Sequence, residues 1–286
     1  MLVRAPYDAS QMLMHTDGMS SGRFCAVAYR FAIERGDYSA FASGQVLYSA
    51  PGYTAFPVRL ANEVAQRCFA LLGSLGVSAP YTLYDPCCGS AQLLTILAYL
   101  HGDQLRAIRA SDSDSQAIRF AERNLALLTL SGLDMRIAEI ASLTQRFGKA
   151  SHAEALVHAA GLRDHLVAMQ TAGALSVHVF RADASSGDDL RAHLGSDRVD
   201  LVVTDVPYGR QTAWQSGMEQ DPNVLAGSRL LAALHPILQV QSVVAVAANR
   251  QQAIQHPAYR RVDYLRIGKR HITFLTPVRR ERDLHN

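Results

Sequence analysis

From residue 58 onward, longer amphipathic stretches alternate with short apolar ones, and this alternation limits the fold more than any other feature of the chain. The short stretches predict strands over residues 82–84, 105–110, 176–180, 199–204 and 242–247. The longer stretches carry apolar residues at helical spacing and predict helices over residues 58–76, 90–99, 115–130 and 223–238. Strands separated by helices predict an α/β fold with a doubly wound, mostly parallel sheet.

Three parts of the chain depart from this alternation. Residues 261–267 and 271–275 flank a Gly-Lys-Arg turn and predict an antiparallel C-terminal hairpin at the sheet edge. Residues from about 133 to 172 are helical by composition and predict an insertion between the second helix and the third strand. Residues 1–79 contain one strand-like stretch at 24–31 and predict an N-terminal extension that leads into the core domain, residues 80–286, and is not an independent unit.

The composition excludes several classes of protein. With 49% hydrophobic residues, 19% charged residues and a net charge of +3, the chain is not wholly disordered. We expect a cytoplasmic protein, because the first residues lack the apolar core of a signal peptide and no apolar run is long enough to span a bilayer. The cysteines form no C-x-x-C pair and the histidines show no metal spacing, so we expect reduced thiols and no bound metal.

An acidic, glycine-containing loop follows the first predicted strand of the sheet. It consists of Asp85, Pro86, Cys87, Cys88, Gly89 and Ser90. Ligands of doubly wound sheets bind at the carboxyl ends of the strands, and Gly89 lets the backbone approach a ligand closely. An acid at this place repels a pyrophosphate and attracts an ammonium group. Since the dinucleotide fingerprint G-x-G-x-x-G is also absent, a nicotinamide-dependent oxidoreductase is disfavoured.

Two further acidic motifs close the second and fourth predicted strands. A carboxylate at the position of Asp112, next to Ser113, can accept hydrogen bonds from both hydroxyls of a ribose, whereas Asp114 is placed to cap the following helix. At the fourth strand, Asp205 precedes Pro207 and Tyr208. The proline stiffens the loop, the tyrosine offers a stacking surface for a planar base, and the aspartate can accept a proton or a hydrogen bond from that base.

Together these motifs resemble the class I, Rossmann-like methyltransferases that use S-adenosylmethionine. The resemblance implies that residues 85–90 form the cofactor loop and that Asp112 holds the ribose. It further places Asp183 near the adenine and, through the motif at residues 56–60, Phe56 and Arg59 near the methionine end of the cofactor. Asp205, Pro207 and Tyr208 would face the methyl acceptor. Cys87 and Cys88 are interpreted as small packing residues, because direct transfer needs no covalent cysteine intermediate.

A narrower resemblance rests on residues 122–125 and 201–205, which are similar to RNA methyltransferases that act on guanine in ribosomal RNA. The whole chain, with its extension and insertion, resembles the AviRa family of avilamycin-resistance methyltransferases. This implies a 23S rRNA or large-subunit substrate and resistance to an orthosomycin antibiotic. Amino-group methyltransferases usually carry two prolines in the acceptor motif, and here Val206 replaces the first. We therefore prefer guanine N1 over N2, with Asp205 accepting the N1 proton.

The basic residues suggest where RNA would bind. Residues 259–286 hold eight basic and three acidic residues, a net charge of +5 that suits phosphate binding. The predicted RNA-binding residues are Arg210, Trp214, Arg266, Lys269 and Arg270, although the hairpin residues also suit an exposed turn and Trp214 a place in the core. A methyltransferase for DNA adenine or a protein amide, and a noncatalytic RNA-binding module, remain alternatives. A monomer is the default oligomeric state.

Overall fold

The computed structural model describes residues 29–42, 45–49, 52, 55–169, 175–206 and 222–278. The strands of these residues form one seven-stranded sheet in the order β3-β2-β1-β4-β5-β7-β6. Their bounds are β1 Tyr81–Asp85, β2 Leu105–Asp112, β3 Ser176–Arg181, β4 Val199–Asp205, β5 Leu238–Ala248, β6 Tyr259–Ile267 and β7 Arg270–Pro277. Strands β1 to β5 are parallel to one another, whereas β7 is antiparallel to both β5 and β6. This confirms the predicted class I fold with its C-terminal hairpin.

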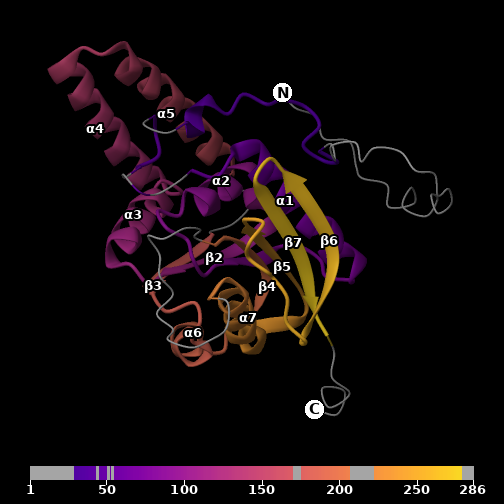
Figure 1. The fold of residues 1–286 in the computed structure, drawn as a ribbon. Coiled ribbons are helices and arrows are strands. Elements are labelled where there is room, and N and C mark those ends of the chain that lie inside the picture. The colour runs from indigo at the N-terminus through magenta and orange to yellow at the C-terminus, as the bar shows by residue number, and fades with distance from the viewer. Residues whose placement is uncertain are drawn as a thin grey trace.

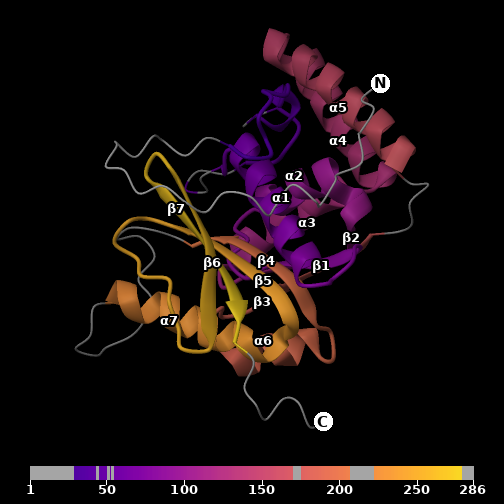
Figure 2. The ribbon, with the colours of Figure 1, turned by 90° about the vertical axis from the view of Figure 1, so that its right-hand side faces the viewer.

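Helices cover both faces of the sheet (Figure 1). Their bounds are α1 Val58–Ser74, α2 Gln92–His101, α3 Ser115–Ala126, α4 Leu130–Phe147, α5 Ala150–Met169, α6 Gly187–Leu194 and α7 Pro222–Leu234. Short 3-10 turns lie at η2 Ser39–Phe41, η3 Gly102–Gln104 and η5 His235–Ile237. Figure 2 shows α1, α2 and α3 on one face of the sheet and α6 and α7 on the other.

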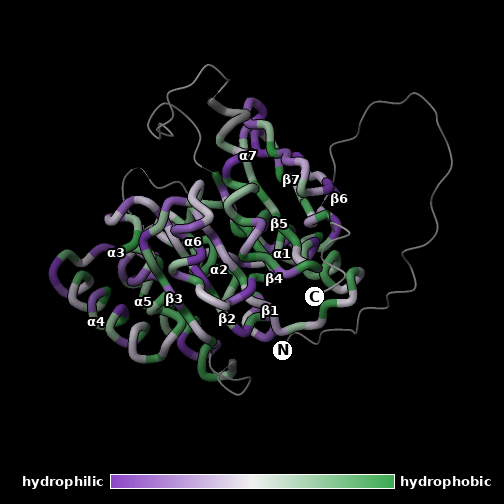
Figure 3. Tube along the Cα trace, turned by 90° about the horizontal axis from the view of Figure 1, so that it is seen from below, coloured by the Kyte–Doolittle hydropathy of each residue, from purple (hydrophilic) through white to green (hydrophobic). Residues whose placement is uncertain are grey.

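The core is divided by the sheet into two layers. Leu83 and Leu201 point into a cluster shared with α1 to α5, whereas their neighbours Tyr84 and Val202 point into a cluster shared with α6 and α7. The strand residues are therefore buried on both faces, as parallel strands covered by helices require. Figure 3 shows the consequence: the central strands β4 and β5 are largely hydrophobic, and hydrophilic residues alternate with hydrophobic ones along α4.

The predicted insertion is a pair of helices, α4 and α5, that projects from one side of the domain (Figure 1). The expectation of one continuous helix over 115–130 is wrong. Helix α3 ends at Ala126, and the side chain of Thr129 caps α4 by accepting a hydrogen bond from the Gly132 N–H at 3.1 Å. A hydroxyl that caps a new helix competes with the continuation of the old one, which explains the break.

Residues 29–33 of the N-terminal extension lie against α1 in an irregular conformation. The strand expected at 24–31 is absent over its described part, 29–31. Instead, the backbone N–H groups of Arg30, Phe31 and Ala32 donate to the buried carboxylate of Glu63 at 2.8–2.9 Å. Glu63 also accepts from Arg67, whose guanidinium reaches Asp263 of β6 at 2.8 Å. One buried ionic network thus ties the extension, α1 and the hairpin together.

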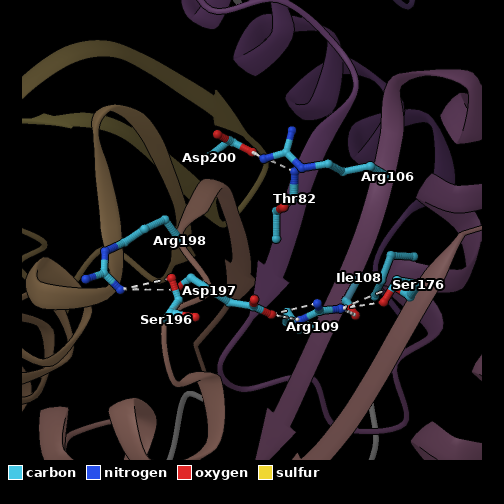
Figure 4. A network of polar contacts seen from close by, with 9 residues as sticks. All are labelled: Thr82, Arg106, Ile108, Arg109, Ser176, Ser196, Asp197, Arg198 and Asp200. Atoms are coloured by element: carbon cyan, nitrogen blue, oxygen red, sulfur yellow. Dashed lines mark hydrogen bonds and ion pairs between the residues drawn. The ribbon is translucent and has the colours of Figure 1, made fainter.

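At the edge where the parallel strands begin, acidic residues of β4 and its preceding loop are paired with arginines of β2 (Figure 4). Asp200 accepts hydrogen bonds from the Thr82 N–H at 2.7 Å and from Arg106 at 2.5 Å. Asp197 accepts from Arg109 at 2.7 Å. These contacts join the first residues of β1, β2 and β4 and have a structural role.

Candidate active site

Three aspartates gather at the opposite edge, where the parallel strands end. Asp85 is the last residue of β1, Asp112 of β2 and Asp205 of β4, and β1 lies between the other two strands. Sequence analysis predicted all three as site residues, and the structure brings them together. The negative charges of Asp112 and Asp205 both act on the Asp85 carboxyl, which places the three groups within electrostatic reach of one another.

Asp85 is the most deeply buried of the three, with 2% of its surface exposed. Burial raises the pKa of this carboxyl to about 7, and the neighbouring charges of Asp112 and Asp205 act in the same direction. The nearby Thr204 hydroxyl and a hydrogen bond from the Cys87 N–H, at 3.0 Å, act on the pKa in the opposite direction. A carboxyl with this pKa changes its charge near neutral pH and is sensitive to a cation that binds beside it.

The loop of residues 85–90, which is the predicted cofactor loop and keeps that name below, turns sharply between β1 and α2. Gly89 and Ala91 both adopt the left-handed conformation, with φ of 54° and 55°. The loop is fixed to the end of β2, because the Cys88 N–H donates to the Ser111 carbonyl at 2.9 Å and the Gly89 N–H donates to Asp112 Oδ2 at 2.9 Å. Two adjacent strand ends and the loop between them therefore form one rigid unit.

Asp112 is partly buried, and burial raises the pKa of its carboxyl. Its second oxygen, Oδ1, accepts from the Asp114 N–H at 3.0 Å. Each carboxylate oxygen has two lone pairs, so both can still accept from a diol. Asp114 caps α3 by accepting from the Gln116 N–H at 2.8 Å, as predicted, and Ser113 is exposed beside it.

The environment of the two thiols in the loop disfavours the thiolate form that a nucleophile needs. Burial raises the pKa of Cys87 and of Cys88 well above the usual value, and the charges of Asp85 and Asp112 raise both further. Both side chains therefore stay protonated, which supports the prediction that they pack and do not react. Pro86 and Ser90 are buried within the same loop.

Asp183 follows β3, the neighbour of β2, and is exposed. Its carboxylate accepts from the N–H and the hydroxyl of Ser185, both at 2.8 Å, and its charge reaches Cys87 of the cofactor loop. The chain therefore places Asp183 on the side of the site next to Asp112. A contact with adenine remains a prediction.

Phe56 and Arg59 lie at the start of α1. Phe56 is 5% exposed and belongs to the core. Arg59 donates to the carbonyls of Ala32 at 2.9 Å and Ile33 at 2.7 Å, and its guanidinium lies over the Tyr29 ring. Arg59 therefore holds residues of the N-terminal extension, and its contact with the cofactor stays a prediction.

The basic residues of the hairpin fall into two groups. Arg266 and Lys269 are exposed near its tip. Arg270, the first residue of β7, turns inward instead: its Nη2 lies 3.4 Å from Asp205 Oδ2, and its guanidinium lies over the Phe56 ring. The sequence did not predict this pairing. Four predicted site residues, Pro207, Tyr208, Arg210 and Trp214, lie outside the described residues.

Sequence analysis also missed Asn124, a fully buried residue of α3. Its side chain accepts from the Tyr48 N–H at 2.8 Å and donates to the carbonyls of Tyr48 at 2.9 Å and Ser90 at 2.8 Å. Gln92 donates to the same Tyr48 carbonyl at 3.0 Å. The extension is thereby bonded to the cofactor loop. The available signal was an amide among the apolar residues on the buried face of an amphipathic helix.

Comparisons with known proteins agree with this geometry. The family model described as rRNA methyltransferase AviRa matches residues 27–270. A curated 23S rRNA (guanine(2535)-N(1))-methyltransferase of Streptomyces viridochromogenes is 44% identical over 243 residues, which cover 85% of this chain and 93% of that protein. Two solved structures of the rRNA methyltransferase aviRa from Streptomyces viridochromogenes are 41% and 40% identical, with TM-scores of 0.77 and 0.78. Each match covers 87% of this chain and 96% of the other.

None of the helices in the described ranges combines the length and the apolar character that a bilayer crossing needs.

Proposed function

This chain belongs to the AviRa family of rRNA methyltransferases, and from that premise we propose that it methylates a guanine base of 23S rRNA with S-adenosylmethionine as the methyl donor. The observation that carries the proposal is the convergence of Asp85, Asp112 and Asp205 on one sheet edge beside a basic hairpin. The 44% identical relative is named for guanine N1, which supports N1 over N2. Methylation of this kind would protect the large ribosomal subunit from avilamycin in the cytoplasm, with the enzyme acting as a monomer.

The residues of the site fit this cofactor. Buried carboxylates at Asp85 and Asp112 create a negative potential that favours a cationic ligand. Asp112 retains acceptor capacity for the ribose hydroxyls, and Gly89 lets the backbone approach closely. Asp183 would lie toward the adenine, with Phe56 near the methionine end.

In the proposed reaction, Asp205 acts as the base. When bound, the cofactor supplies a methyl group attached to a sulfonium sulfur; the bond between this carbon and the sulfur breaks, and the sulfur becomes a neutral thioether. The Asp205 carboxylate accepts the N1 proton, and the electron pair of the N1–H bond forms the new bond from N1 to carbon. One negative and one positive charge are neutralised together. Pro207 and Tyr208 would shape and stack the acceptor pocket.

The RNA would approach over the hairpin tip. Arg266 and Lys269 are exposed there, close in the chain to Arg270, which reaches Asp205. Arg210 and Trp214 would add contacts from the segment after β4. A base in a helix cannot reach such a pocket without leaving its stack, so the target guanine lies in a loop or is flipped out.

The proposal is tested by incubating the protein with cofactor labelled in the methyl group and with 23S rRNA, DNA or protein acceptors. We expect label in 23S rRNA alone. Reverse transcription across the labelled site should stop, because a methyl group on N1 blocks Watson–Crick pairing. Label confined to DNA or protein would overturn the RNA assignment, and label on N2 would overturn the preference for N1.

A further inference from the structure

We propose that Arg270 is a positioning residue of the reaction, which orients the Asp205 carboxylate and keeps it ionised to accept the proton of guanine N1. This inference rests on the proposed function and deepens it. Arg270 was grouped with Arg266 and Lys269 as a phosphate-binding residue, and the structure separates it from them.

The pairing of Arg270 with Asp205 is fixed by the sheet register. Asp205 of β4 pairs with Ala247 of β5, and Ala247 pairs with Ile272 of β7. Arg270 begins β7 two residues before Ile272, so the pairing of the strands places it at the edge of the sheet where β4 ends. The distance of 3.4 Å between Nη2 and Oδ2 follows from that placement.

The guanidinium of Arg270 also contacts an aromatic ring. Its carbon atom lies 5.2 Å from the centre of the Phe56 ring, and Phe56 is 5% exposed. The side chains of Arg270 and Asp205 are 20% and 19% exposed. A charge that contacts both a buried ring and a carboxylate, and is largely shielded from water, is poorly placed to follow an RNA backbone, whereas exposed Arg266 and Lys269 are well placed.

The acidic neighbours of Asp205 favour its protonated form, and a cation beside Asp205 opposes that effect. Asp85 of β1 faces Asp205 closely enough for their charges to interact, and Asp112 of β2 adds a third carboxyl on the same side. Neighbouring carboxylates favour protonation of one another, and a protonated Asp205 cannot accept the N1 proton. Arg270 of β7 opposes this effect, since a cation within about 4–6 Å favours the charged form of a carboxyl.

The test compares Arg270→Met, Arg270→Lys and Arg266→Gln by pH profile and by RNA binding. Methionine keeps an apolar stem over Phe56 and removes the charge. For Arg270→Met we expect the acidic limb of kcat/KM to move to higher pH by about 1–3 units, because the base loses its cation. Arg270→Lys should recover most of that shift. The salt dependence of RNA binding should not change in Arg270→Met, whereas Arg266→Gln should flatten it and leave the pH limb in place.

Several outcomes would overturn the inference. If Arg270→Met flattens the salt dependence and leaves the pH limb unmoved, Arg270 is a phosphate contact. If Arg270→Met does not fold, Arg270→Gln decides, because glutamine also removes the charge: an acidic limb at the wild-type pH in Arg270→Gln contradicts the positioning role. If the wild-type protein does not methylate 23S rRNA, the proposed function itself is refuted. If the wild-type protein is active and the acidic limb of Arg270→Met lies at the wild-type pH, only the role of Arg270 is refuted.

Discussion

Where the parallel strands begin, Asp200 is 4% exposed and accepts hydrogen bonds from Arg106 and from the Thr82 N–H (Figure 4). Where the same strands end, Asp85 is similarly buried, with 2% of its surface exposed, and its pKa is raised to about 7 mainly by burial. Among the described residues, no basic side chain forms an ion pair with Asp85 or Asp112. Acids of similar burial thus have different electrostatic environments at the two edges.

This difference in electrostatic environment indicates a structural role for the acids where the strands begin and a functional role for those where the strands end. Asp200, which is paired with an arginine and a backbone N–H group, keeps strands together and has little remaining capacity for a ligand. Asp85 and Asp112, which have no such arginine partner among the described residues, destabilise the empty fold and attract a cation, which is typical of functional sites. The comparison therefore predicts that substitutions at the strand ends change ligand binding and chemistry, whereas substitutions at the strand starts change stability.

The largest effect is expected at Asp205. In Asp205→Asn the side chain keeps its shape and cannot accept the N1 proton, so the methylation rate should fall by about 10²–10⁴-fold. Cofactor affinity, measured by calorimetric titration of S-adenosylhomocysteine, should change little. A rate within threefold of wild type would remove Asp205 from the role of base.

Asp112 should control cofactor affinity. Asp112→Ala removes two acceptors for the ribose, and with about 1.5–3 kcal/mol for each hydrogen bond to a charged group, affinity should fall at least about 100-fold. The matched control is Asp200→Ala, which removes a buried aspartate from the other edge. Equal losses of affinity in the two variants would contradict the division between the edges.

Stability should respond in the opposite way. Asp200→Ala leaves the Thr82 N–H without its acceptor and removes the charged acceptor of Arg106, which keeps only the Pro80 carbonyl. We expect a loss of about 1–3 kcal/mol in the free energy of unfolding. Urea denaturation measures it. Activity per folded molecule should stay at the wild-type level, and a selective loss of activity would show that this edge also serves the reaction.

A smaller, mixed effect is expected at Asn124, which joins the two regions of the site. Asn124→Ala removes the bonds from α3 to Tyr48 and Ser90, which loosens the cofactor loop. We expect the KM for the cofactor to rise about tenfold, equivalent to about 1.4 kcal/mol, with a smaller change in kcat. An unchanged KM in a destabilised variant would make Asn124 a packing residue only.

The sequence predicted the parts of this site that can be recognised from local patterns. Acids at the ends of apolar stretches identified Asp85, Asp112 and Asp205 before any three-dimensional information, because parallel strands end at one edge. The partners of these residues come from distant parts of the chain: Arg270 is 65 residues from Asp205, and Tyr48 is 76 residues from Asn124. Such pairings depend on the insertion of β7 beside β5 and on the path of the extension, which no local pattern encodes.

The central claim is that the carboxyls of Asp85 and Asp112 at the strand ends favour the binding of a cationic cofactor. Proton release on cofactor binding tests this claim most directly. A cation beside Asp85 lowers its pKa, so affinity should rise as the pH increases from about 5 to about 7, and the carboxyl should release its proton on binding. The folding stability of the cofactor-free protein depends on pH in the opposite direction. Because the pKa of Asp85 in the folded protein lies above the usual 3.8, stability falls as the pH rises from about 4 to about 7.

Titration calorimetry with S-adenosylmethionine at pH 7, in two buffers of different ionisation enthalpy, counts the protons released. For a group with a pKa of about 7 the account predicts about half a proton more from the wild-type protein than from Asp85→Asn, with Asp200→Asn like wild type. Equal proton release from the wild-type protein and Asp85→Asn would contradict the account.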